Sequence, residues 1–78
     1  MELLVKKYNY ENLCKLLIGK KAKFLSDCEF FPNFKVIGRV LEINIANNGE
    51  YLIKIRTNTN KIIDIGSNMY NLRFVILF

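Results

Sequence analysis

The hydrophobic and polar positions of this chain follow two periods, a helical one near the start and an alternating one over most of the remainder. Apolar residues between Tyr10 and Ile18 recur at intervals of three and four, which is the spacing of one helix face. Asn9 suits an N-cap and Gly19 suits a C-terminal stop, so we predict a helix from Asn9 to Ile18. The preceding segment, Leu3 to Lys7, fits either an edge strand or an extended lead.

Five later segments alternate apolar and polar residues, as strands with one buried face do. They are residues 20–25, 34–45, 51–56, 61–65 and 73–77. The second is long for a strand of a small sheet, and its alternation changes phase. We therefore predict a bend or bulge near Leu41. Gly38, in the same segment, lets the strand curl tightly.

The connections between these strands carry turn signals. Asn48-Gly49 lies between two alternating runs and predicts a tight hairpin with positive φ at both positions. A second hairpin is expected at residues 57–60. Residues 26–33 contain the only proline and break the period, which indicates a long irregular loop. Residues 66–72 are short enough for a single 3₁₀ turn.

These elements predict a mainly β fold: a five-stranded barrel with a short N-terminal α-helix and a 3₁₀ turn before the last strand. Seventy-eight residues allow one domain, with residues 1–19 as an N-terminal extension and residues 20–78 as the barrel. The apolar tail from Phe74 to Phe78 cannot place every side chain in one small core. Either the helix or a second subunit covers its other face, so a monomer and a homodimer both stay open.

Composition sets the class of protein. Hydrophobic residues make up 51% of the chain but are dispersed, and no run approaches the roughly 20 residues of a membrane span. The first residues lack the order of a basic start and an apolar middle that a secretory signal has. We expect a soluble cytoplasmic protein. Cys14 and Cys28 fit no zinc or redox spacing and are interpreted as free, partly buried thiols.

The sequence contains few candidate catalytic residues. The chain has no histidine, and its seven carboxylates are scattered through different elements. Neither glycine-rich phosphate loop is present. Asp27 and Glu29 alternate in a loop, but two carboxylates without further oxygen ligands are better interpreted as a solvated loop than as a metal site. We predict no enzyme activity and expect no cofactor or metal.

Positive charge gathers at the outward positions of the middle strands. Lys35 and Arg39 lie on the second strand, and Lys54 and Arg56 on the third, in a chain of net charge +5. Such a stripe suits a phosphate backbone, whose neutralisation releases counterions. The alternative is that these cations only keep the sheet surface solvated and its edges unpaired, since Glu42 and Asp64 dilute the stripe.

A second candidate surface lies in the long loop. Phe30 and Phe31 cannot easily both face inward, and an exposed aromatic beside the acids Asp27 and Glu29 is typical of a protein-contact patch. Tyr70, before the last strand, is a further candidate for this patch. The alternative is that the loop caps the end of the barrel and the tyrosine packs half-buried.

Several motifs together resemble the Src-homology-3-like barrels found in many small proteins of low-GC bacteria and their phages. They are Gly38, Val40 and Ile43, the Asn48-Gly49 turn, Ile53 with Ile55, and the closing SNMYNLRFV. The resemblance implies a non-catalytic binding module. Our first hypothesis is that this module docks on a protein partner, as a small phage-type, anti-CRISPR-like inhibitor of a host defence or nucleic-acid-handling complex. Direct nucleic-acid binding is the first alternative. The second is sequestration of a nucleotide-like ligand between subunits.

Overall fold

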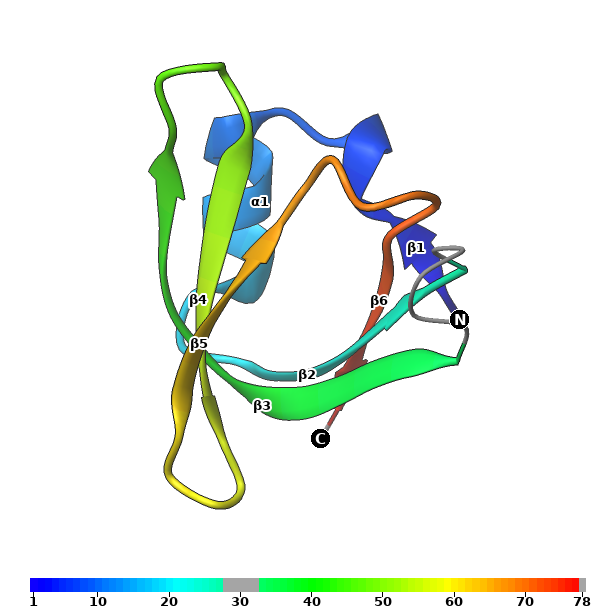
Figure 1. The fold of residues 1–78 in the computed structure, drawn as a ribbon, viewed down its shortest axis with the longest axis vertical. Coiled ribbons are helices and arrows are strands. Elements are labelled where there is room, and N and C mark those ends of the chain that lie inside the picture. Colours follow the sequence, from blue (N-terminus) through cyan, green and yellow to red (C-terminus); the bar gives the residue numbers. More distant parts are fainter. Residues whose placement is uncertain (28–32, 78) are drawn as a thin grey trace.

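The computed structural model describes residues 1–27 and 33–77 of the chain. Its elements, in order, are strand β1 (Leu3–Leu4), a 3₁₀ helix (Val5–Lys7), helix α1 (Tyr10–Leu17), and strands β2 (Lys21–Ser26), β3 (Phe34–Ile45), β4 (Tyr51–Thr57), β5 (Ile62–Gly66) and β6 (Arg73–Leu77). The strands form one antiparallel sheet in the order β1-β6-β2-β3-β4-β5. Figure 1 shows that the sheet is strongly curled rather than flat.

The mainly β prediction is confirmed, but the strand number is six rather than five. The additional strand, β1, is only two residues long and pairs with β6. It lies in the segment for which the sequence pattern fitted both a strand and an extended lead. The structure divides that segment, because the chain turns into the 3₁₀ helix at Val5, whose buried side chain joins the core.

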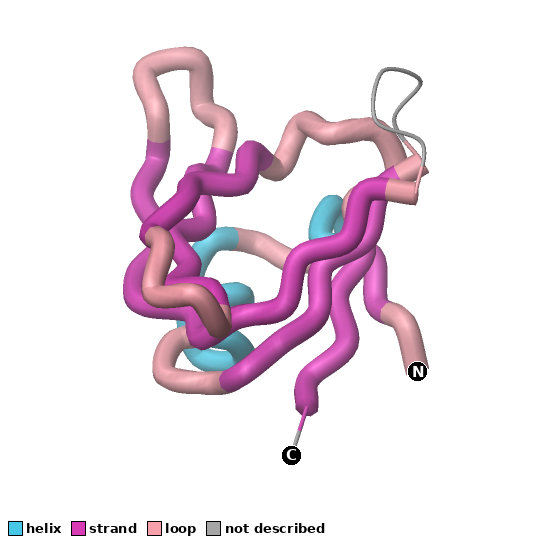
Figure 2. The backbone as a smooth tube through the Cα atoms, turned by 60° about the horizontal axis from the view of Figure 1, so that its bottom comes forward, coloured by secondary structure: helices cyan, strands magenta, loops and turns pink. Residues whose placement is uncertain are grey.

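Helix α1 follows the prediction closely. The Asn9 side chain accepts a hydrogen bond from the backbone of Asn12 at 2.8 Å, and Gly19 has a φ of +83° just beyond the helix. The buried residues Leu13 and Leu17 join the same core as Phe74 of β6. The helix therefore lies on the inner side of the curled sheet, as the tube in Figure 2 also shows. The outer face of β6 keeps partly exposed apolar side chains.

The core is built from both halves of the curled sheet and from the N-terminal segment. Its largest fully buried side chains are Phe24, Phe74, Leu13, Leu17, Ile53, Ile55 and Leu72. The rings of Phe24 and Phe74 lie 6.3 Å apart on paired strands, and Tyr8 meets Phe74 edge-on at 5.8 Å. No helix in the described part of the chain is long and apolar enough to cross a membrane.

Strand β3 bends as predicted. Its register against β4 shifts between Val40 and Glu42, so Leu41 is the extra residue of a bulge. Val40 and Ile43 both point into the core, which strict alternation without an extra residue would forbid. Gly38 is buried on β3, at a position where an added Cβ would collide with the backbone of Arg56. The bulge and the glycine together let one strand serve both halves of the sheet.

The two hairpins share one geometry, which differs from the one predicted for the Asn48-Gly49 turn. The Ala46 amide donates to Glu50 O at 2.8 Å and Gly49 takes a φ of +86°, whereas Asn48 is not left-handed. The loop thus has three residues and ends in a bulge, one residue longer than the predicted tight turn. The hairpin between β4 and β5 repeats it, with Asn60 at a φ of +62°.

Residues 67–72 form consecutive turns and not the single predicted 3₁₀ turn. The Met69 amide donates to Gly66 O and the Leu72 amide donates to Met69 O, each at 3.2 Å. Asn71 has a φ of +55°, a left-handed conformation that a 3₁₀ helix does not accommodate. The reversal at Asn71 aims the chain directly into β6, and Leu72 is fully buried there.

Candidate nucleic-acid interface

Three cations lie in one row across the outer face of the sheet. Lys21 of β2 is the register partner of Arg39 on β3, and Arg39 is the partner of Arg56 on β4. All three residues are exposed. Side chains that are directly opposite on adjacent strands share a face and lie within about 5.5 Å at Cβ. We call Lys21, Arg39 and Arg56 the cation row.

One member of the cation row is held in place. Arg39 Nη1 donates to Gly19 O at 2.6 Å. Beside it, the backbone amide of Gly19 donates to Val40 O and the backbone amide of Val40 donates to Lys20 O, each at 2.9 Å. The side-chain bond uses one of the five guanidinium donors and leaves the others for a ligand. Within the described residues, no member of the cation row forms an ion pair with an acid.

The cation row forms a wall of a polar hollow at the base of the β4–β5 hairpin. This cationic hollow has a volume of about 290 Å³. Its lining residues are Lys21, Arg39, Arg56, Thr57, Asn58 and Asn60. Among the residues that the structure describes, its lining therefore contains cations and neutral polar groups but no acid.

A second, largely apolar hollow adjoins the first. It has a volume of about 350 Å³ and lies between the first half of β3 and the same hairpin. We call it the apolar hollow; it is lined by Lys35, Val36, Ile37, Thr57, Asn58, Thr59, Lys61 and Ile63. Thr57 and Asn58 line both hollows, so the two share a wall.

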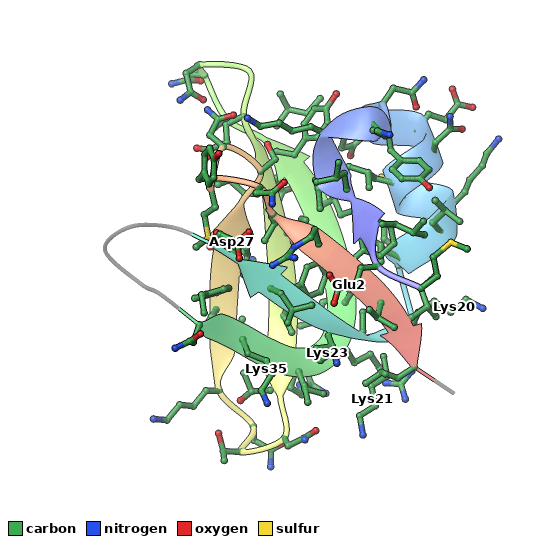
Figure 3. All side chains as sticks on the ribbon, turned by 90° about the vertical axis from the view of Figure 1, so that its right-hand side faces the viewer. Glu2, Lys20, Lys21, Lys23, Asp27 and Lys35 are labelled. Carbon is green, nitrogen blue, oxygen red and sulfur yellow. The ribbon has the colours of Figure 1, made fainter. Side chains whose placement is uncertain are left out.

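The four cations predicted to form a stripe are only partly brought together. Arg39 and Arg56 are direct partners, whereas Lys35 precedes Arg39 by four residues on β3 and lies opposite Leu25. Figure 3 shows Lys35, Lys21 and Lys23 on the same side of the sheet, well below Asp27. Lys35 lies at the rim of the apolar hollow.

Lys54 stands apart from the cation row because it is neutralised. Its Nζ lies 2.9 Å from Glu42 Oε1, and its register partner on β5 is Asp64. The hydrogen bond from Lys54 lowers the pKa of the Glu42 carboxyl, and the same bond raises the pKa of the Lys54 ammonium. The dilution by acids that the sequence suggested is therefore concentrated at Lys54 and does not reach Arg39 or Arg56.

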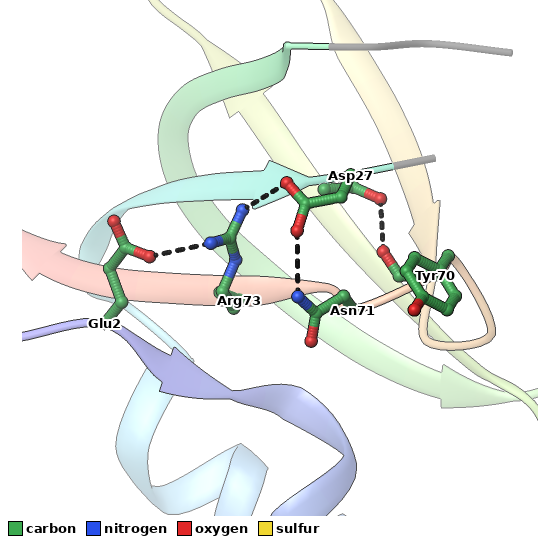
Figure 4. A network of polar contacts seen from close by, with 6 residues as sticks. Glu2, Asp27, Tyr70, Asn71 and Arg73 are labelled. Carbon is green, nitrogen blue, oxygen red and sulfur yellow. Dashed lines mark hydrogen bonds and ion pairs between the residues drawn. The ribbon is translucent and has the colours of Figure 1, made fainter. Parts of the chain in front are cut away.

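The acid proposed for the protein-contact patch has a structural role. Asp27 Oδ1 pairs with Arg73 Nη2 at 2.9 Å, and Asp27 Oδ2 accepts a hydrogen bond from the side-chain Nδ2 of Asn71 at 2.9 Å (Figure 4). The same guanidinium pairs with Glu2 through Nη1 at 3.1 Å. Asp27 thus joins the end of β2 to the start of β6, and both of its carboxylate oxygens are engaged.

The remaining residues of that patch are placed unevenly. Tyr70 is 69% exposed, while its backbone carbonyl accepts a hydrogen bond from Ser26 Oγ at 2.7 Å. The side chain therefore points away from the anchored backbone, and its exposure differs from the half-buried packing weighed as the alternative. Glu29, Phe30 and Phe31 lie outside the described residues.

The hairpin residues that line the two hollows were not proposed as binding residues from the sequence. Thr57, Asn58 and Asn60 were assigned there only to a turn, although the four consecutive polar residues 57–60 that follow Arg56 are a signal of their own. A scan against protein-family models and searches of curated proteins and of solved structures found no match to this chain.

Proposed function

We propose that this protein binds nucleic acid through the cation row and does so without catalysing a reaction. The observation that carries the proposal is the alignment of Lys21, Arg39 and Arg56 on three adjacent strands at the wall of one hollow. Strands lie about 4.8 Å apart, so three positive charges are confined to roughly 10 Å. A phosphate backbone offers a matching density, with one charge per ~3.4 Å of each strand of a duplex.

The alignment has an energetic cost that a ligand would remove. Like charges directly opposite on adjacent strands destabilise a sheet, and Arg39 faces Arg56 in this way. Solvation of a sheet surface alone does not require two like charges to lie directly opposite each other. The neighbouring position illustrates the ordinary arrangement, since Lys54 has Glu42 on one side and Asp64 on the other.

The proposal includes the scaffold, an open barrel of the Src-homology-3-like kind. It is supported by the order β6-β2-β3-β4-β5 of the five strands predicted from sequence, and by the single bent strand β3 that belongs to both halves. A fold of this kind does not define a ligand by itself. It supplies a rigid sheet on which the cation row and the two hollows keep fixed positions.

Binding should be measured as a function of salt. We expect a fluorescently labelled oligonucleotide to bind at low ionic strength, with log K falling linearly against log salt at a slope of about −2 to −3, the value for three phosphate contacts. Fluorescence anisotropy titrations across a salt series give this slope. Absence of measurable binding at low ionic strength, or an affinity that does not change with salt, would refute the proposal.

Docking on a protein partner is the second candidate function, and the exposure of Tyr70 favours it. A large, exposed aromatic on an anchored backbone has the character of an interface anchor. Its predicted partner, a host defence or nucleic-acid-handling complex, stays a prediction, as does sequestration of a nucleotide-like ligand between subunits.

The protein-docking candidate predicts that Tyr70→Ser loses a partner that the unaltered protein captures. Ile62→Ser is a matched control, because Ile62 is also an exposed apolar side chain (57%) but lies on the edge strand β5. Affinity capture of the three tagged proteins, followed by mass spectrometry, compares them. Equal capture by Tyr70→Ser and the unaltered protein argues against a role of Tyr70 in docking.

A further inference from the structure

We infer that the site binds an unpaired nucleotide, with the phosphate on the cation row and the base in the apolar hollow. The inference rests on the proposed function and adds the form of nucleic acid. It follows from the shared wall of the two hollows, which places a concentration of positive charge beside an apolar surface. Phosphate and base are likewise adjacent within each nucleotide, so one ligand unit can occupy both hollows.

The apolar hollow has the size and lining for one planar, uncharged group. Val36, Ile37 and Ile63 give it aliphatic walls and are themselves only partly buried. Its volume of about 350 Å³ is at the lower end of the range of ligand pockets, about 300–1,000 Å³. The apolar hollow is therefore suited to a single heterocycle rather than to a helix or a peptide segment.

The positive charges around the apolar hollow favour an apolar group that is attached to an anion. Lys35 and Lys61 line the hollow together with the aliphatic residues, and the cation row lies on the other side of the shared wall. An uncharged lipid chain or an apolar peptide would gain nothing from these cations. A base carried on a phosphate backbone complements both the aliphatic walls and the positive rim.

The shared wall also supplies a group for the edge of a base. Thr57 Oγ1 is occupied, since it accepts from the Lys61 amide at 3.2 Å and shares a hydrogen bond with Thr59 Oγ1 at 3.0 Å. Asn58 is exposed, and no hydrogen bond of its side chain is found within residues 1–27 and 33–77. Its amide offers both donors and an acceptor beside the hollow.

Entry of a base into this hollow requires that the base be unstacked and unpaired. In a duplex the faces of the bases are covered by their neighbours, and only the edges reach a protein. A single strand presents base faces freely, which is how most proteins that bind single strands contact them. The walls here are aliphatic rather than aromatic, so we expect little discrimination between bases.

Three probes of equal length test the inference: an oligothymidylate, an abasic strand with the same phosphates, and a duplex. We expect the oligothymidylate to bind about tenfold more tightly than the abasic strand, which corresponds to the burial of one base face. The duplex should bind no more tightly than the abasic strand. Equal affinity for oligothymidylate and abasic strand overturns the inference and leaves the proposed function standing. Absence of binding by all three refutes the proposed function itself.

A variant in the apolar hollow gives an independent reading. Ile37→Thr keeps a β-branched side chain on β3 but makes the wall polar, and it should remove most of the advantage of oligothymidylate over the abasic strand. Binding of the abasic strand should stay unchanged. Leu52→Thr is the matched control, because Leu52 is equally half-buried on β4 but lines neither hollow. An equal loss of affinity for both probes in Ile37→Thr contradicts a base in this hollow.

Discussion

Alanine in place of Gly38 is expected to lower the free energy of unfolding by about 3 kcal/mol, the upper part of the range for overpacking a well-packed site. A Cβ at position 38 would collide with Cγ2 of Ile55 and with the backbone carbonyl of Arg56. The methyl group of Ile55 belongs to a fully buried side chain, and the carbonyl belongs to a paired strand. Neither can give way without separating β3 from β4.

A second glycine provides the control for this prediction. Gly49→Ala makes the same chemical change at a φ of +86°, where a Cβ would meet nothing within 4 Å. Its cost is conformational alone, about 1 kcal/mol. Urea unfolding of the two variants separates the effects, and the contact explanation fails if Gly38→Ala is no more destabilising than Gly49→Ala.

The fold was predictable wherever interactions between residues close in sequence determine the structure. The helix follows from its apolar spacing, from the Asn9 cap and from Gly19, and each of these acts within a few residues. The bulge at Leu41 was visible because a change of phase in a strand has few other physical causes. Boundaries of these elements agree with the prediction to within a residue or two.

The fold prediction was wrong where contacts with distant segments of the chain determine the local structure. Strand β1 forms because the edge of β6 is available to pair with it, and two residues carry no period of their own. The Asn48-Gly49 turn is one residue longer than predicted because the Ala46 to Glu50 bond closes the hairpin further out. Asn71 becomes left-handed so that Leu72 enters the core, a tertiary requirement that no turn motif encodes.

The candidate site was predictable as a tendency and not as a geometry. The alternation of apolar and polar residues predicted that Arg39 and Arg56 face outward. Only the register across the bulge makes these two residues direct partners and places Lys54 opposite Glu42, with which it forms an ion pair. A single residue of slip would have placed Arg39 opposite Ile55 or Thr57 instead of Arg56. The contribution of Lys21 depends on the pairing of β2 with β3, two segments separated by a loop whose length sets no register.

Removal of two charges from the cation row is expected to cause the largest change in binding. The double variant Arg39→Gln with Arg56→Gln should bind single-stranded oligonucleotides roughly a hundredfold more weakly at low ionic strength, if each charged contact is worth about 1.5 kcal/mol. The magnitude of the salt slope should fall by about 1.4, because each phosphate contact on a single strand contributes about 0.7.

The control removes a charge that lies on the same face but is already paired with an acid. Lys54→Gln changes the net charge by one unit but affects a lysine already paired with Glu42, so we expect its salt slope to stay close to that of the unaltered protein. A similar loss in Lys54→Gln and in Arg56→Gln alone would mean that net charge, rather than the cation row, governs binding.

Thermal unfolding of the same variants distinguishes a lost contact from a lost fold. Arg56→Gln removes the repulsion across the Arg39–Arg56 pair and breaks no ion pair found in the described residues, so its melting temperature should not fall. Arg39→Gln also loses the bond to Gly19 O and should be the less stable of the two single variants. Weaker binding by Arg56→Gln at undiminished stability assigns the loss to the site, because a protein that only needed these arginines for folding would lose both together.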